Sequence, residues 1–180
     1  MAVKKVIRMG HPVLRQTAAP LTDEEIGSPE TKELVQDLLD TMAAEDGIGI
    51  AAPQIGISKQ VALVGVPEDS ERYPDAEETP LYVVINPKIK FLDETPQGFW
   101  EGCLSVPGLR GYVERPRKIQ VDFKNLEGEE QTLVLEDFDA TVFQHELDHL
   151  FGVLYVDRIK DSKQLMYTEE FVEFYAKEEE

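Results

Sequence analysis

Cysteine and long apolar runs are what this sequence most clearly lacks. Cys103 is the only cysteine among 180 residues, so no internal disulfide can form, and a lone thiol suits a reducing compartment. No stretch approaches the roughly 20 apolar residues that a membrane helix needs, and the basic N-terminal stretch is followed by no apolar segment. We therefore expect a cytoplasmic protein, or an organellar one after processing, with no membrane partner.

Positive charge is also scarce. Lys and Arg number 18 against 36 Asp and Glu, which gives a formal net charge of -18 at pH 7. A chain with this charge is repelled by nucleic acid and by anionic membranes unless its cations gather in a patch. The lysines and arginines are scattered along the sequence instead, so we expect no nucleic-acid partner.

The length and the 42% hydrophobic content predict one globular domain over residues 1–180. The first helix is predicted within "GSPETKELVQDLLDTMAAEDG", where Ser28 can cap the helix and Pro29 occupies its first position. Gly47 is the expected left-handed residue at its exit. Five apolar side chains at helical spacing form the expected buried face: Leu34, Val35, Leu38, Leu39 and Met42.

Runs rich in β-branched residues predict strands at 60–66 and 81–89, separated by a polar loop at 67–80. The runs "KIQVDFKN" and "QTLVLE", joined through Glu127 and Gly128, predict a hairpin. A second helix is expected over about residues 139–150, ending at Gly152, and a third over about 163–177. Few helices among several strands, without regular alternation, indicate an α+β fold with a mainly antiparallel sheet.

The stretch "QHELDHLFG" places His145 and His149 four residues apart, so that both imidazoles can reach one ion from the same helix face. Glu146 then flanks that ion and can take a proton from a bound water. Phe138 and Val142 lie on the histidine side and can line a pocket. The alternative is a helix whose histidines are satisfied in the core. A third ligand would decide between them.

Three residues are candidates for this third ligand. His11 lies in an extended N-terminal stretch, and Glu169, twenty positions after His149, resembles the carboxylate ligand of thermolysin-like metalloproteases. The sequence around Glu169 is also typical of an ordinary acidic amphipathic helix. Cys103, in "EGCLSVPG", lies between Gly102 and a turn, where a thiolate would be a strong ligand for iron or zinc. A lone cysteine is, however, more often a small buried hydrophobe.

The segment "GIGIAAPQIG" superficially matches a dinucleotide-binding loop, but such a loop must leave a strand and open a helix. Here a helix precedes the segment and Pro53 follows it. An extended, glycine-spaced strand with room for another backbone alongside is the better interpretation. Gln54 then offers a neutral amide that can donate to a developing oxyanion.

The motifs "GIGIAAPQ", "EGCLS" and "HELDH" occur in this order over nearly the whole sequence, which therefore resembles the peptide deformylases. Enzymes of this family remove the formyl group from the N-terminal methionine of new polypeptides. The resemblance implies antiparallel sheets packed around a central metal-binding helix, with an N-terminal and a C-terminal helix. It further implies three metal ligands and one general base and acid: Cys103, His145 and His149, with Glu146.

Further roles are also implied by the resemblance. A metal-bound hydroxide attacks the formyl carbon, and Gln54 and the backbone N–H of Leu104 stabilise the oxyanion. Ferrous iron is the usual family metal, although zinc, nickel or cobalt can occupy such a site. Gly49 pairs with the backbone of the N-formylmethionyl peptide, which adds to a sheet edge near residues 48–50. The other expected substrate-binding residues are Ile48 and Arg110, with Phe99, Phe138 and Val142 around the methionine side chain.

The C-terminal stretch departs from one property of the family. Some bacterial members dock on the ribosome through a basic C-terminal helix, whereas residues 161–180 contain seven acidic residues and two lysines. Ribosome docking through this helix by charge is therefore not expected. Two rival functions are a small metalloprotease that uses Glu169 and an inactive binding module whose metal only stabilises the fold.

Overall fold

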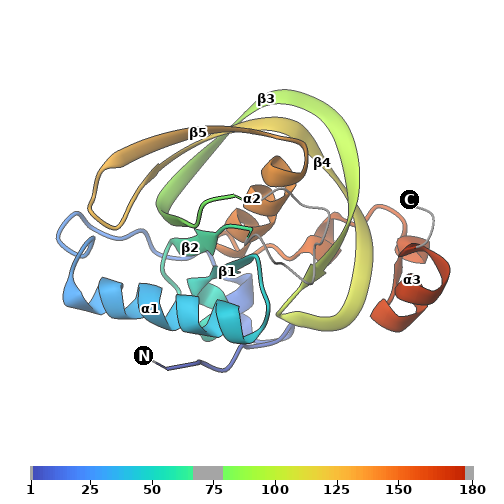
Figure 1. The fold of residues 1–180 in the computed structure, drawn as a ribbon, viewed down its shortest axis with the longest axis horizontal. Coiled ribbons are helices and arrows are strands. Elements are labelled where there is room, and N and C mark those ends of the chain that lie inside the picture. The colour runs from blue at the N-terminus through green and yellow to red at the C-terminus, as the bar shows by residue number, and fades with distance from the viewer. Residues whose placement is uncertain (1, 67–78, 177–180) are drawn as a thin grey trace.

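The computed structural model describes residues 2–66 and 79–176, which form one antiparallel sheet with helices on both of its faces (Figure 1). The α-helices and strands are α1 (Pro29–Ala44), β1 (Gly49–Ala51), β2 (Val61–Val64), β3 (Tyr82–Cys103), β4 (Val106–Lys124), β5 (Glu130–Glu136), α2 (Asp137–His149), β6 (Leu165–Tyr167) and α3 (Thr168–Phe174). Four short 3-10 helices connect them: η1 (Pro12–Arg15), η2 (Ala52–Ile55), η3 (Tyr155–Arg158) and η4 (Ser162–Gln164).

The strands follow the order β1-β2-β3-β4-β5, and β6 adds to β4; every one of these pairs is antiparallel. The pairing of β3 with β4 shifts register at several points, including one between Glu101 and Cys103. Such bulges bend a strand and increase its twist. As a result the two long strands arch over α2 (Figure 1). The predicted α+β fold around a central helix is confirmed.

The short strand β2 is buried on both faces and separates two cores. Val61 and Leu63 point toward α1, whose Leu38 packs with them. Ala62 and Val64 point the opposite way and pack with residues of α2 such as Phe143. This alternation follows from the two-residue period of a strand. Burial of both faces explains why β2 contains no polar residue.

Helix α1 follows the sequence prediction except at its exit. The Ser28 side chain accepts a hydrogen bond from the Thr31 N–H at 3.2 Å, as a cap should, and Pro29 is the first helical residue. The prediction that Gly47 is the left-handed residue is wrong. Asp46 adopts that conformation instead, with φ of 50°. Aspartate tolerates this region because its short polar side chain can bond locally.

The predicted hairpin is confirmed as β4 and β5, with Gly128 at φ of 82° in its turn. The third predicted helix, over 163–177, is wrong in its first part. Asp161 accepts a hydrogen bond from the Lys163 N–H and begins the 3-10 helix η4, and the next three residues then pair with β4 as β6. Sheet pairing therefore overrides the helical pattern, and only α3 is α-helical.

Helix α2 begins and ends within two residues of the prediction, and Gly152 follows it at φ of 74°. A Cβ on Gly152 would lie 2.7 Å from the backbone of Arg15, so only glycine fits there. Most of the predicted polar loop, residues 67–78, lies outside the described residues. In the part of the chain that the structure describes, no helix is long and apolar enough to cross a membrane.

Candidate metal centre

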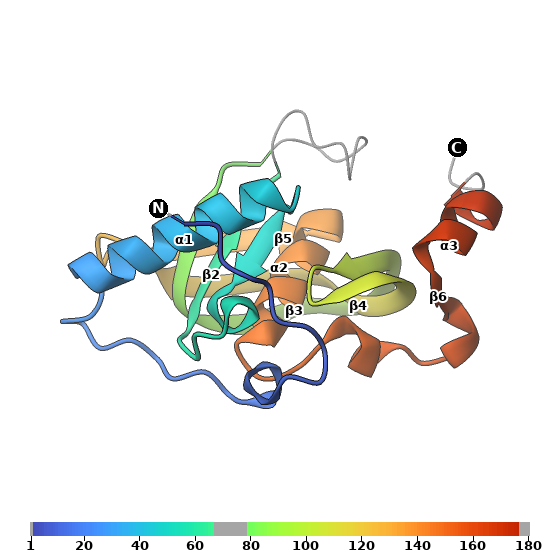
Figure 2. The same ribbon diagram turned by 90° about the horizontal axis from the view of Figure 1, so that it is seen from below.

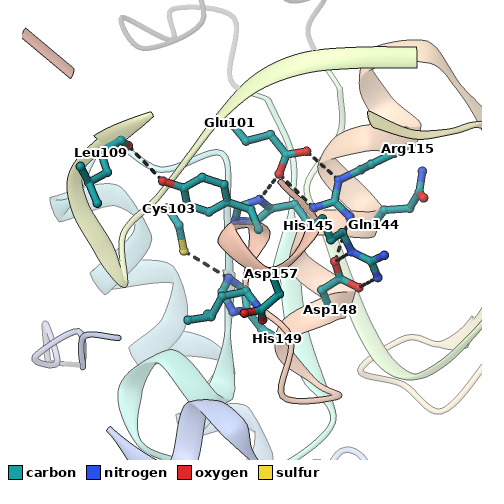
Figure 3. A network of polar contacts seen from close by, with 12 residues as sticks. Glu101, Cys103, Leu109, Arg115, Gln144, His145, Asp148, His149 and Asp157 are labelled. Atoms are coloured by element: carbon teal, nitrogen blue, oxygen red, sulfur yellow. Dashed lines mark hydrogen bonds and ion pairs between the residues drawn. The ribbon is translucent and has the colours of Figure 1, made fainter. Parts of the chain in front are cut away.

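Cys103, His145 and His149 come together in the interior of the protein. One potential ligand atom from each lies within 4.8 Å of the other two, and all three residues are buried. Cys103 ends β3, directly before the turn into β4, whereas the histidines lie one helical turn apart on α2. The Cys103 Sγ is 3.3 Å from the His149 Nε2 (Figure 3). The fold thus brings a cysteine from β3 next to the two histidines of α2.

His145 is oriented by a carboxylate. Its Nδ1 lies 2.7 Å from the Glu101 Oε2, which leaves its Nε2 as the nitrogen available for an ion. Burial by itself raises the pKa of Glu101, but hydrogen bonds with Arg115 and His145 outweigh it and lower this pKa to about 2. Glu101 is therefore an anion at neutral pH and accepts a hydrogen bond from the Nδ1 of this imidazole.

Glu101 belongs to a row of alternating charges that leads from His145 to the surface (Figure 3). Arg115 binds both Glu101 oxygens, at 2.6 and 2.9 Å, and also Asp148 at 2.8 Å. Arg158 then binds both oxygens of Asp148 at 2.6 Å. Arg115 is almost fully buried. Although burial lowers its pKa, Glu101 and Asp148 raise it, so the guanidinium stays charged.

The chemistry of the cluster suits a metal cation. Burial, with the charges of His145 and Arg115, lowers the pKa of His149 well below its usual value, so this imidazole is neutral, the form that binds metals. Burial opposes protonation of His145 too, but Cys103 and Glu101 raise its pKa well above the usual value. The cluster thus attracts positive charge. One thiolate and two imidazoles also match iron, zinc and neighbouring metals.

The other two candidate ligands lie elsewhere. Glu169 is exposed on α3, and His11 is exposed at the start of η1, where its Nδ1 accepts a hydrogen bond from the Val13 N–H. Neither belongs to the cluster formed by Cys103, His145 and His149. The geometry therefore favours sulfur as the third ligand.

A pocket opens beside the cluster and contains most of the predicted substrate-binding residues. Phe99 on β3 and Phe138 on α2 form its apolar part, with ring centroids 5.7 Å apart in an edge-to-face arrangement. Val142, Ile48, Leu104 and Glu146 also line it. Sequence reasoning therefore grouped residues that the fold does bring to one cavity.

Gln54 reaches the same pocket from η2. Its side-chain oxygen accepts a hydrogen bond from the Ala51 N–H at 2.8 Å, which fixes the direction of the amide. Its Nε2 lies 3.6 Å from the Cys103 Sγ and 3.3 Å from the Ser105 Oγ. The amide donor therefore points toward the Cys103 sulfur.

Gly49 lies directly against Glu146. A Cβ on Gly49 would lie 2.6 Å from the Glu146 Oε1, so a larger residue at this position would displace the Glu146 side chain. In the described part of the chain, β1 pairs with β2 alone, and the Gly65 N–H donates to the carbonyl of Ile48. Because bonded positions alternate in an antiparallel pair, the N–H and C=O of Gly49 point away from β2. They face an edge to which another strand can add.

Arg110 lies outside this pocket. It pairs in register with Met166 of β6 and lines a second, adjoining pocket. Cys103 and Leu104 line both pockets, so the second one extends the cavity away from the apolar end. Arg110 is therefore separated from the apolar end of the first pocket, where Phe99 and Phe138 lie.

Sequence reasoning did not identify Glu101, Arg115 or Trp100 as parts of the site. Glu101 is the first residue of the "EGCLS" motif, and a carboxylate two residues before a candidate ligand on a strand points to the same face. The spacing of Glu101 and Cys103 in the sequence could therefore have indicated Glu101 as part of the site. The pairing of Glu101 with Arg115, in contrast, depends on the register of β3 with β4.

Known proteins are similar to this chain in sequence. Residues 3–165 match the family model described as Polypeptide deformylase. A peptide deformylase of Leptospira biflexa is 48% identical over 170 residues, which cover 94% of this chain and 95% of that protein. Peptide deformylase 1 of Nitrosomonas europaea is 46% identical over 167 residues, 93% of each chain.

Solved structures agree with the sequence comparisons. A class I type b peptide deformylase of Acinetobacter baumannii with bound Met-Ala-Ser has a TM-score of 0.83 and 41% identity, and the match covers 88% of this chain and 99% of that one. The peptide deformylase of Synechococcus elongatus in complex with actinonin has a TM-score of 0.79 and 37% identity, with 89% and 81% covered. By its sequence and its fold, this chain belongs to the polypeptide deformylase family, hydrolases that remove the N-formyl group from new polypeptides.

Proposed function

We propose that this chain releases formate from N-formylmethionine at the start of newly made polypeptides, at a metal held by Cys103, His145 and His149. The observation that carries this proposal is the buried cluster of one thiol and two imidazoles beside a carboxylate, Glu146, and an apolar pocket. Residues 1–180 act as one catalytic domain.

The metal, when bound, supplies a Lewis acid that polarises the formyl carbonyl and increases the acidity of water. Ferrous iron is the proposed ion, with zinc, nickel or cobalt as possible substitutes, because a thiolate donates more charge than a third imidazole. Glu101 keeps the His145 ring in its ligating orientation. Loss of that contact is expected to weaken metal binding.

Glu146 moves the proton of the reaction. It takes a proton from the attacking water and delivers it to the methionine nitrogen as the carbon–nitrogen bond breaks, so that formate and a free amine result. The oxyanion that forms in between accepts hydrogen bonds from the Gln54 amide and from the backbone N–H of Leu104. Gln54 is suited to this role because its oxygen is engaged by Ala51 and its Nε2 faces Cys103.

The substrate binds as an added strand on the open edge of β1. The N–H and C=O of Gly49 bond the backbone of the substrate, next to the Glu146 carboxylate. Ile48, which precedes β1 and lines the pocket, is held by a hydrogen bond from the Gly65 N–H to its carbonyl. The methionine side chain enters the apolar end of the pocket, between Phe99, Phe138 and Val142. The Acinetobacter structure with Met-Ala-Ser supports this class of ligand. Arg110 contacts the peptide farther along.

The proposed substrates are nascent or recently released chains in the cytoplasm. With seven acidic residues and two lysines in residues 161–180, the C-terminal segment has the wrong charge to bind ribosomal RNA. We therefore propose that the enzyme meets its substrates without docking through this segment.

The test is formate release from formyl-Met-Ala-Ser by ferrous-loaded protein kept free of oxygen, because a thiolate site oxidises readily. We expect turnover that a chelator abolishes and added ferrous iron restores. Folded, metal-replete protein that releases no formate would refute the proposal. The same protein should not cleave the unformylated peptide, which separates deformylation from proteolysis.

A further inference from the structure

The C-terminal segment returns to the substrate side of the molecule. After η4, β6 pairs with residues 109–111 of β4, and α3 follows directly. Figure 2 shows α3 at one end of the molecule, beyond β4 and apart from α1 and α2. The helix therefore lies outside the two cores on either side of β2.

Those contacts form an aromatic cluster of Trp100, Tyr112, Phe171 and Tyr175. The Trp100 ring centroid lies 5.0 Å from that of Phe171, 5.7 Å from that of Tyr175 and 5.5 Å from that of Tyr112. Trp100 and Tyr112 are opposite each other in the pairing of β3 with β4. A Cβ on Gly98 would lie 2.0 Å from the Tyr112 hydroxyl, so glycine makes room for the cluster.

The aromatic cluster adjoins the substrate pocket through Trp100. Glu101 and Cys103 point to the histidines, and because side chains alternate along a strand, Trp100 points to the opposite side, where α3 lies. Trp100 nevertheless lines the same pocket as Cys103, and it is only partly buried. It therefore lies at the mouth of the pocket, whereas Phe138 lies at the apolar end.

We propose that α3 supports the mouth of the substrate site, with Phe171 and Tyr175 holding Trp100 where the peptide beyond the formylmethionine leaves the pocket. This inference rests on the proposed function. Phe171 and Tyr175 are positioning residues that act through Trp100, and the substrate class concerned is formylated peptides longer than formylmethionine itself. The acidic C-terminal segment thus has a role in substrate binding that requires no nucleic acid.

The test compares the Phe171→Ala/Tyr175→Ala double variant with wild type on two substrates, formyl-Met-Ala-Ser and formylmethionine amide. Loss of two aromatic contacts is expected to raise KM for the tripeptide about tenfold. KM for the amide and kcat for both substrates should stay within about twofold, because the groups that react are untouched. An unchanged KM for the tripeptide, or an equal rise for both substrates, would overturn the proposal.

The control is the Val172→Ala/Phe174→Ala variant, which removes two exposed side chains from the same helix. It should match wild type in both KM values. Should the first double variant fail to fold, Phe171→Ala alone carries the test, with Phe171→Leu expected to recover part of the lost affinity.

Fluorescence supplies a readout that does not depend on turnover, because Trp100 is the only tryptophan. Binding of the product Met-Ala-Ser should shift the emission of Trp100 in wild type and in the control variant. The Phe171→Ala/Tyr175→Ala variant should emit at longer wavelength without ligand and require more peptide for the shift. Unaltered emission in that variant would overturn the proposal. Formate release by wild type tests the proposed function separately, so the two failures are distinguishable.

Discussion

Helices α1 and α2 lie on opposite faces of the same strands but differ in what they bury. Helix α1 buries apolar side chains such as Leu38 on one side and exposes charged residues on the other. Helix α2 is buried nearly all round, and its buried residues include Gln144, His145, Glu146 and His149. Burying polar groups costs free energy unless each finds a partner.

The partners of α2 come from strands that are distant in the chain. Glu101 accepts a hydrogen bond from His145, Arg115 donates to Glu101, and Gln144 donates to the carbonyl of Pro116. Helix α1 therefore covers a core, whereas α2 carries chemistry that β3 and β4 make possible. Substitutions on the two helices should separate stability from catalysis.

The largest effect is expected from Glu146→Gln on α2. This substitution keeps the shape of the side chain but removes its ability to accept and deliver a proton, so formate release should fall about 10²–10⁴-fold. Metal content, measured on the same preparation, should be unchanged. A variant with a near-normal rate would refute the role of Glu146, and one without metal would make it a ligand.

The next largest effect is expected on stability, from Arg115→Met. This substitution leaves Glu101 buried without its cation, which typically costs about 3–5 kcal/mol in the free energy of unfolding. Arg117→Met is the matched control. Its partner Asp137 and Arg117 itself are exposed, and such a surface pair contributes about 0–1 kcal/mol. Denaturant unfolding of both variants in the metal-free state checks the difference; equal losses would contradict the importance of the buried row of charges.

On α1, Leu38→Ala should lower the free energy of unfolding by about 2–5 kcal/mol, because it leaves a cavity in the core. Leu38 is fully buried among residues of α1, β1 and β2. The rate of formate release per folded molecule should stay near that of wild type. A selective loss of rate, with stability intact, would contradict the division of roles between the two helices.

The smallest effect is expected from Asp122, which lies on β4 opposite Thr132 of β5. Hydrogen bonds from Thr132, Lys90 and Gln120 lower the pKa of Asp122 to about 2. Because its folded-state pKa lies below the unfolded one, the stabilisation is present above about pH 4 and is lost as the pH falls toward 2. Asp122→Asn should therefore be slightly less stable than wild type at neutral pH, and the difference in melting temperature should shrink over that interval. A constant difference would contradict this assignment.

Local patterns in the sequence predicted what depends on neighbouring residues. The cap at Ser28, the helical spacing around Leu38 and the hairpin turn at Gly128 each involve interactions within a few positions. The left-handed residue is Asp46 and not the adjacent Gly47, so the pattern located the helix exit to within one position. The motif His145–His149 likewise required only one helical turn.

Features that depend on strand register could not be predicted in this way. Trp100 meets Tyr112, and Glu101 meets Arg115, only because β3 and β4 pair through several bulges. Pairing of β6 with β4 also decides that residues 165–167 are extended, despite a pattern typical of a helix. Tertiary contacts outweigh local preference in each case.

The absorption spectrum of the cobalt-loaded protein tests directly whether a sulfur from β3 joins the two histidines of α2 as a metal ligand. We predict thiolate-to-cobalt charge-transfer absorption in wild type, and its loss in Cys103→Ser. The Glu169→Ala variant, as the control, should keep the wild-type spectrum. Absence of that absorption in wild type, or loss of the ion from Glu169→Ala and not from Cys103→Ser, would contradict the account.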